Sequence, residues 1–188
     1  MRQARALTIT GARIVTPTGV ITGALRAENG VITALGSDVA AQEGDEVTDA
    51  RGQLVAPGLI DFGVFAVDKP AFHFGGITRA ALMPDQAPPL DLPSRVGFIA
   101  KSGKPDLWVH PLAAATRELA GRELAELALM QEAGARGVAT GRGWIADSGV
   151  MLRLLEYAAM LDMVVVTHAE DGGLVGAAVA TAGEIATR

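Results

Sequence analysis

The stretch from residue 54 to residue 65 constrains the fold most, because it is an apolar run broken once, by Pro57-Gly58. Proline lacks the N–H that a central strand needs, and glycine tolerates backbone angles that other residues avoid. The pair therefore predicts a break between two strands. After the break, residues 59–65 have the length and apolar character of a buried strand in a parallel sheet.

The residues before this break predict a small, twisted antiparallel sheet of short strands joined by tight turns. Residues 7–15 alternate as a strand does, and Asn29-Gly30 lies between two apolar segments, which is a strong hairpin signal. The expected strands are residues 7–15, 23–27, 31–35, 47–50 and 53–55, with a turn at 17–19.

After the break, strand-like and helix-like segments alternate. The expected strands are residues 59–65, 76–83, 107–110, 137–140 and 163–168, and the expected helices are residues 93–101, 122–133, 150–161 and 172–182. This alternation predicts parallel strands with right-handed crossovers. The units fit the first part of a (β/α)₈ barrel, although a complete five-stranded doubly wound domain is an alternative.

Two domains are therefore expected: residues 1–56 as a small β domain and residues 57–188 as a partial barrel. Such a partial barrel would leave two open sheet edges. The sequence stops at Thr187-Arg188 in a stretch that is compatible with a helix, which favours a truncated barrel over one completed by another chain.

Composition excludes several classes of protein. With 49% hydrophobic and 20% charged residues the chain can form a packed core, and its net charge of −5 argues against nucleic acid as a partner. The absence of cysteine excludes disulfides, a thiolate nucleophile and a zinc knuckle. No apolar run reaches the roughly 20 residues of a membrane span, and no signal peptide is evident. We expect a cytoplasmic protein with no membrane partner.

The sequence Val55-Ala56-Pro57-Gly58-Leu59-Ile60-Asp61 resembles the start of the first barrel strand in the amidohydrolase superfamily. It is most similar to the branch that holds dihydroorotases, allantoinases and hydantoinases. Further similar motifs follow in register at residues 75–78, 83–89, 124–127, 132–135, 155–158 and 167–171. The resemblance implies a metal-dependent-hydrolase-type (β/α)₈ TIM barrel, with residues 1–56 forming the N-terminal half of a small β-sandwich.

The resemblance also implies where a catalytic metal would bind. The family continues its first strand as Asp-x-His-x-His, but the two histidine positions are Gly63 and Phe65 here. Its bridging Asp or carboxylated Lys after strand four falls in the run Thr140-Gly141-Arg142. Glycine and phenylalanine donate no lone pair, and an arginine opposes a dication. We expect Phe65 to fill the core.

His168, at the end of the fifth predicted strand, is the one retained ligand position. One imidazole cannot hold zinc alone, so His168 is expected to be a vestigial ligand. His110, at the predicted end of strand three, is interpreted as structural, and His73 lies in a predicted loop. Glu170-Asp171 could act as acid and base, but we interpret them as the start of a solvated loop.

Two substrate-binding positions also differ from the family pattern. The arginine that pairs with a substrate carboxylate in the family is Val67 here, and an apolar side chain cannot form that bidentate pair. The family's asparagine after strand two is Asp85, which would repel a carboxylate. No catalytic or substrate-binding residue is therefore predicted.

The resulting hypothesis is a catalytically inactive dihydroorotase-like protein of pyrimidine biosynthesis that needs no cofactor. The resemblance implies a structural partnership with aspartate carbamoyltransferase and assembly as a homo-oligomer. The alternative is an active zinc-dependent cyclic amidohydrolase with a displaced site, built from His73, His110, His168 and residues beyond this segment. A small-molecule-binding barrel without turnover is a third possibility.

Overall fold

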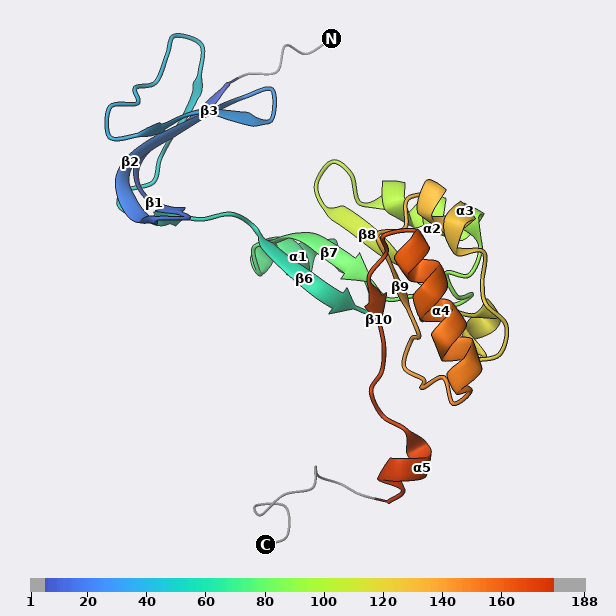
Figure 1. Ribbon diagram of the computed structural model, residues 1–188. Helices are drawn as coiled ribbons and strands as arrows, with labels where there is room; N and C mark the ends of the chain where they lie inside the picture. The colour runs from blue at the N-terminus through green and yellow to red at the C-terminus, as the bar shows by residue number, and fades with distance from the viewer. Residues whose placement is uncertain (1–5, 178–188) are drawn as a thin grey trace, which may run out of the picture. The chain divides into compact units, whose positions relative to one another are not determined.

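The computed structural model describes residues 6–177, and the chain divides into two compact units, Met1–Pro57 and Gly58–Arg188 (Figure 1). The first unit is a five-stranded sheet in the order β3-β2-β1-β4, with β5 also pairing with β1. Its strands are β1 (Leu7–Thr16), β2 (Gly19–Glu28), β3 (Val31–Gly36), β4 (Glu46–Asp49) and β5 (Leu54–Val55).

The predicted hairpin is present, because Asn29 and Gly30 connect β2 to β3 with positive φ values of 51° and 78°. The prediction of an antiparallel sheet is wrong for the other edge, where β4 and β5 both run parallel to β1. The connection from β3 to β4 is longer than a hairpin turn. It therefore crosses to the far side of β1 before the chain re-enters the sheet.

An ion pair ties this crossover to the sheet. Arg26 in β2 donates from Nε to Asp45 Oδ2 at 2.9 Å and from Nη2 to Asp45 Oδ1 at 3.0 Å. The Thr8 hydroxyl donates to the same carboxylate at 2.6 Å. The hydrogen bonds from Arg26, then those from Thr8 and the Gln42 amide, hold the pKa of Asp45 well below its usual range.

Acid should therefore loosen the first unit through Asp45. Because its folded-state pKa lies below its unfolded value, the stabilisation is present above about pH 4 and is lost as the pH falls toward the folded-state pKa. We expect hydrogen exchange of β1 and β2 amides to accelerate between neutral pH and about pH 3, beyond the intrinsic pH effect. Asp45→Asn should exchange faster at neutral pH and respond less to acid. Glu43→Gln, in the same connection, is the matched control, and an unchanged acid response in Asp45→Asn would contradict this account.

The second unit is a five-stranded sheet in the order β10-β9-β8-β7-β6, and every neighbouring pair is parallel. This arrangement confirms the predicted α/β half-barrel. The strands are β6 (Leu59–Val64), β7 (Ile77–Leu82), β8 (Trp108–Ala114), β9 (Gly137–Ala139) and β10 (Val165–Val166). The helices are α1 (Lys69–Phe74), α2 (Pro93–Ser102), α3 (Leu127–Glu132), α4 (Ser148–Met160) and α5 (Gly172–Val175), with a 3₁₀ turn at Arg117–Leu119.

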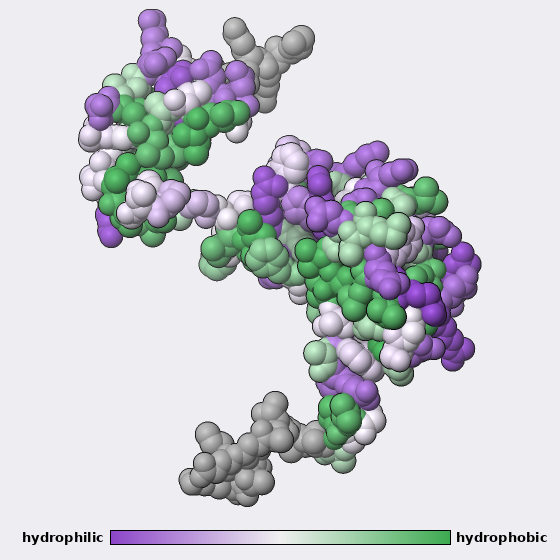
Figure 2. All heavy atoms as spheres, viewed as in Figure 1, coloured by the Kyte–Doolittle hydropathy of each residue, from purple (hydrophilic) through white to green (hydrophobic). Residues whose placement is uncertain are grey.

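One face of this sheet packs against α2, α3 and α4, which lie together beside the strands in Figure 1. The core between them is apolar and fully buried; it includes Leu82, Val109, Val138, Val96, Leu127, Met130, Val150 and Leu154. The opposite face carries Ile60, Ala81, Leu112 and Val166, which line a cavity of about 460 Å³. Hydrophobic side chains are visible in green on the surface of this unit (Figure 2).

The prediction that residues 59–65 form a buried strand is wrong in one respect. They form β6, but Leu59 and Phe62 are 60% and 78% exposed. Within the described residues β6 pairs only with β7, so it is an edge strand whose outer side has no neighbour. Its apolar sequence is that of a strand buried on both faces.

The third strand is longer than predicted, because the sequence interpretation ended it at His110 before Pro111. Instead β8 continues to Ala114. It pairs with β7 up to Pro111 and with β9 from Leu112 onward. Pro111 lies where the pairing changes from one neighbour to the other, which is why a residue without an N–H is tolerated within the strand.

Two helix predictions also change. The helix expected over residues 122–133 is shortened to α3, because Leu124 forms a bridge with Thr116 and keeps the preceding residues extended. Helix α1 was not predicted, although Asp68 caps it by accepting from Ala71 N at 3.1 Å, next to a proline in its first turn. The helix expected over residues 172–182 begins as α5, and its residues from 178 onward lie outside the described part.

Among residues 6–177, each helix is too short or too polar to cross a bilayer.

Candidate active site

The candidate site lies at the C-terminal edge of the parallel sheet, where barrel enzymes place their chemistry. Phe65 follows β6, Asp85 follows β7, Arg142 follows β9 and His168 follows β10. Strand ends of a parallel sheet meet at one edge, which brings these separate segments to the same side of the second unit.

Phe65 and Arg142 contact each other directly. The Arg142 guanidinium carbon lies 4.1 Å from the centroid of the Phe65 ring, a cation–π stack. The prediction that Phe65 fills the core is therefore wrong, because its side chain is 39% exposed and is covered by a charged group. Gln86 fixes the backbone beneath the ring by donating from Nε2 to the Phe65 carbonyl at 3.1 Å.

A double-mutant cycle can measure this stack. The variants Phe65→Leu and Arg142→Gln should each remove it, so their effects on the free energy of unfolding should couple by about 0.5–1 kcal/mol, the range for an exposed cation–π pair. Chemical denaturation of the two single variants and the double variant gives the coupling. Strictly additive effects would show that the two side chains do not stabilise each other.

Asp85 positions the segment that carries Arg142. Its Oδ1 accepts from the Arg142 backbone N at 2.9 Å, while its Oδ2 is buried without a hydrogen-bond partner among the described residues. Gly141 permits this approach: its φ is +75°, and a Cβ there would lie 2.9 Å from Asp85 Oδ1. Asp85 therefore binds the loop after β9, a role that sequence reasoning missed. Its repulsion of a substrate carboxylate stays a prediction.

Thr140 joins β9 to β10 at the same edge. The Thr140 side chain is buried, and its Oγ1 accepts from the His168 backbone N at 3.1 Å. The Thr140 N donates to the Val166 carbonyl at 3.0 Å. The residue thus orders the segment leading to His168 through neutral hydrogen bonds.

The histidines lie apart, each beside a different neighbour. His168 Nε2 lies 3.0 Å from Glu170 Oε2, on an exposed loop. His110 Nε2 lies 3.4 Å from Arg79 Nη1, and His110 is the third residue of β8, toward its N-terminal end. His73 belongs to α1, not to a loop, and its Nε2 lies 3.5 Å from the Asp106 carbonyl.

The donor set at this edge does not fit the catalytic metal of the amidohydrolases. Zinc in hydrolases is bound by several histidine and carboxylate side chains that converge on one point. Across the part of the chain that the structure describes, no three histidine, cysteine or acidic side chains come together in this way. The positions where the resemblance implies ligands hold Gly63, Phe65 and the run that begins at Thr140, and the Arg142 guanidinium from that run stacks on the Phe65 ring.

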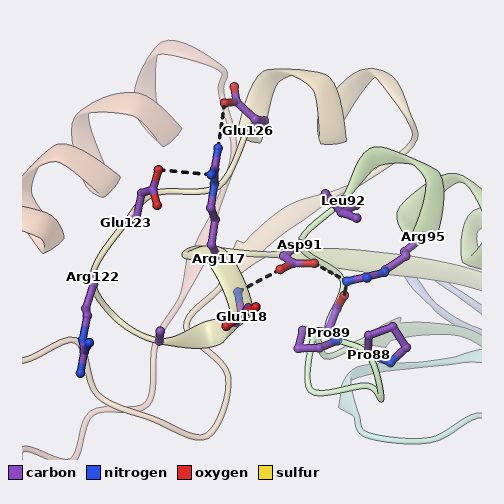
Figure 3. A pocket seen from close by; sticks show the side chains of 11 residues that line it. Pro88, Pro89, Asp91, Leu92, Arg95, Arg117, Glu118, Arg122, Glu123 and Glu126 are labelled. Carbon is purple, nitrogen blue, oxygen red and sulfur yellow. Dashed lines mark hydrogen bonds and ion pairs between the residues drawn. The ribbon is translucent and has the colours of Figure 1, made fainter.

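A further cavity of about 900 Å³ lies around Asp91 and the 3₁₀ turn (Figure 3). Asp91 lies between Arg95, with which it pairs, and the Glu118 backbone N, which donates to it at 2.9 Å. Arg117 pairs with Glu123 at 3.4 Å and with Glu126 at 3.8 Å. The charges of these side chains largely neutralise one another. The hydrogen bond from the Glu118 N to Asp91 stabilises the turn at Glu118, where φ is 54°. The cavity has no convergent ligand set.

Comparisons with known proteins agree with this fold. The family model described as dihydro-orotase-like matches residues 50–188. A dihydroorotase from Geobacillus sp. (strain WCH70) is 35% identical over 178 residues, which cover 87% of this chain and 42% of that protein. A dihydroorotase from Pelotomaculum thermopropionicum is 39% identical over 158 residues, covering 77% of this chain and 37% of that protein.

Solved structures show the same architecture. An L-hydantoinase (dihydropyrimidinase) from Arthrobacter aurescens superimposes with a TM-score of 0.76 at 22% identity, covering 91% of this chain and 42% of that one. A D-hydantoinase from Thermus sp. gives a TM-score of 0.67 at 24% identity, covering 90% and 41%. The chain spans less than half the length of the curated relatives it matches. From the family match and the half-barrel, the chain belongs to the dihydro-orotase-like family.

Proposed function

We propose that this chain is part of a dihydroorotase-like protein that does not hydrolyse dihydroorotate. The observation that carries the proposal is the stack of Arg142 on Phe65 at 4.1 Å. It occupies two of the segments to which the resemblance gives metal ligands. A guanidinium held there supplies a fixed positive charge, and a dication brought to the same place would meet electrostatic repulsion.

The loss of ligands matters because of the chemistry involved. Metal-dependent hydrolases lower the pKa of a bound water toward neutrality, so that hydroxide is available to attack the amide carbon. The described residues at this edge form no ligand cluster that could hold such a metal and its water: His168 contacts Glu170, and Thr140 is used in hydrogen bonds between strands. Val67, in the position of the substrate-binding arginine, cannot hold a carboxylate.

We further propose that the protein acts in pyrimidine biosynthesis as a structural partner of aspartate carbamoyltransferase, within a homo-oligomeric assembly. The support is membership of the dihydro-orotase-like family together with the loss of the implied ligand positions at Gly63 and Phe65. A barrel without a metal can keep its fold and still present its outer surfaces to a partner, because fold and chemistry are separable.

Turnover and association test the two parts of this proposal. The full-length protein, supplied with zinc, should hydrolyse dihydroorotate no faster than a control without protein, and His168→Ala should change nothing. Tagged protein should retain aspartate carbamoyltransferase on an affinity column and comigrate with it in gel filtration. Turnover that disappears in His168→Ala would contradict the first part, and failure to associate would contradict the second.

A second candidate function, an active enzyme, is supported by the relatives, which are named dihydroorotases and are 31–39% identical to this chain. An active cyclic amidohydrolase would need a displaced site that includes residues outside 6–177. His73, His110 and His168 contact different neighbours in the described part and would have to move together. Hydrolysis of dihydroorotate, hydantoin or allantoin that is abolished by His168→Ala would favour this candidate.

A further inference from the structure

A cationic cavity of about 320 Å³ lies at the N-terminal edge of the parallel sheet, at the opposite ends of the strands from the candidate active site. Four cationic side chains line it and no acidic one does: Arg79, Lys101, Lys104 and Arg136. Arg79 comes from β7, Lys101 from the last turn of α2, Lys104 from the loop after α2, and Arg136 from the residue before β9.

Trp108, the first residue of β8, organises this cluster. It is the register partner of Arg79, whose guanidinium carbon lies 5.2 Å from the centroid of the indole. The Lys104 ammonium lies 4.7 Å from the same ring. Cation–π contacts of this kind fix the position of a charge without neutralising it. Both charges therefore remain available to a ligand.

The cluster is not neutralised by the protein. Among residues 6–177, none of the four cations forms an ion pair, and Asp106, the nearest acidic residue along the chain to Trp108, pairs with Lys69 at 4.0 Å. The pKa of His110 is lowered by burial and by the charges of Arg79, Arg136 and Lys104. This concentration of positive charge occurs in a chain whose net charge is −5.

Compensation of helix dipoles does not account for the cluster. Lys101 lies near the C-terminus of α2, and such a terminus carries about half a negative charge. The end of α3 adds a similar partial charge near Arg136. These partial charges balance about one of the four cations, and Arg79, on a strand, lies at no helix end.

We propose that this cavity binds a diphosphate group, as free pyrophosphate or as the end of a nucleoside diphosphate. A diphosphate carries several negative charges and enough oxygens to accept from all four side chains at once. Arginine binds such oxygens in a bidentate manner and lysine binds them as a point charge. The cavity volume is at the lower end of the range for small-molecule sites, which suits a compact anion. The proposal is independent of the proposed function.

Trp108 provides a reporter for the test, since the chain has two tryptophans and Trp144→Phe leaves Trp108 alone. In the full chain, pyrophosphate and a nucleoside diphosphate are titrated separately at constant ionic strength, without divalent cations, and calorimetry measures the same binding directly. We expect a saturable signal. Lys104→Gln and Arg136→Gln, both at exposed positions, should each weaken binding by about tenfold or more, the effect of losing a charged hydrogen bond.

Arg153→Gln is the matched control, because it removes the same charge from an exposed position on α4 and should leave binding unchanged. Tighter binding of the nucleoside diphosphate would identify a nucleotide as the source of the group, and equal or tighter binding of pyrophosphate would identify the free anion. The proposal would be overturned by the absence of saturable binding by either method up to about 10 mM, far weaker than a specific site requires. Equal binding of sulfate, or equal weakening in Arg153→Gln, would also overturn it.

Discussion

Leu154→Ala should lower the free energy of unfolding of the second unit by about 2–5 kcal/mol, the range for removing a fully buried leucine. Leu154 is 0% exposed in the middle of α4 and packs in the core beside Leu127 and Val138. The shortened side chain would leave a cavity that the closely packed sheet and helices cannot fill.

The matched control is Leu152→Ala on the same helix, where the side chain is 57% exposed. Both variants replace a leucine by alanine on the same helix, so they differ only in burial. Because Leu152 is already largely in water, we expect the free energy of unfolding to fall by less than about 1 kcal/mol in Leu152→Ala. Chemical denaturation followed by tryptophan fluorescence isolates the second unit, because residues 1–57 contain no aromatic residue. Equal losses in the two variants would contradict the assignment of the buried face of α4.

Gly103→Ala should destabilise the second unit by about 1–3 kcal/mol, the usual cost of forcing an extra carbon into a packed region. Gly103 ends α2 at an ordinary φ of −87°, so backbone strain is not the reason. A Cβ there would lie 2.3 Å from the Leu107 carbonyl oxygen and 2.9 Å from Val109 Cγ2. The backbone between α2 and β8 would have to move apart.

Gly63→Ala provides the control for this effect. Gly63 lies in β6, and a Cβ added there would meet no atom within 4 Å in the described structure. We expect a change within about 0.5 kcal/mol, as for most exposed substitutions. Denaturation curves of the two variants give the comparison, and a Gly103→Ala variant as stable as Gly63→Ala would show that the α2–β8 junction is not closely packed.

The parallel half-barrel could be predicted because its signals are local. The alternation of apolar segments and the break at Pro57-Gly58 each act through a few neighbouring residues, as does Asn29-Gly30 in the hairpin of the first unit. The direction of β4 and the extent of β8 depend on pairing between distant segments instead. Pro111 ends a strand by local rules, but it is tolerated where β8 changes partner.

In the candidate site, too, the local features could be predicted from the sequence and the long-range contacts could not. The loss of metal ligands at Gly63 and Phe65 was predicted from the identity of the residues alone. The contact that replaces them was not, because Phe65 and Arg142 lie in segments far apart in sequence and meet only at the edge of the sheet. The Asp85 contact with the Arg142 backbone has the same origin. Helix α1 could have been found, since Asp68 followed by Lys69-Pro70 is a helix-start signal.

The zinc content of the purified full-length protein tests the central claim most directly. After incubation with zinc and removal of the unbound metal, elemental analysis should find far less than one zinc ion per chain, and His168→Ala should give the same value. The reason is that an aromatic ring and a guanidinium stand where the ligands would converge. One or two tightly held zinc ions per chain, lost in His168→Ala, would contradict the account.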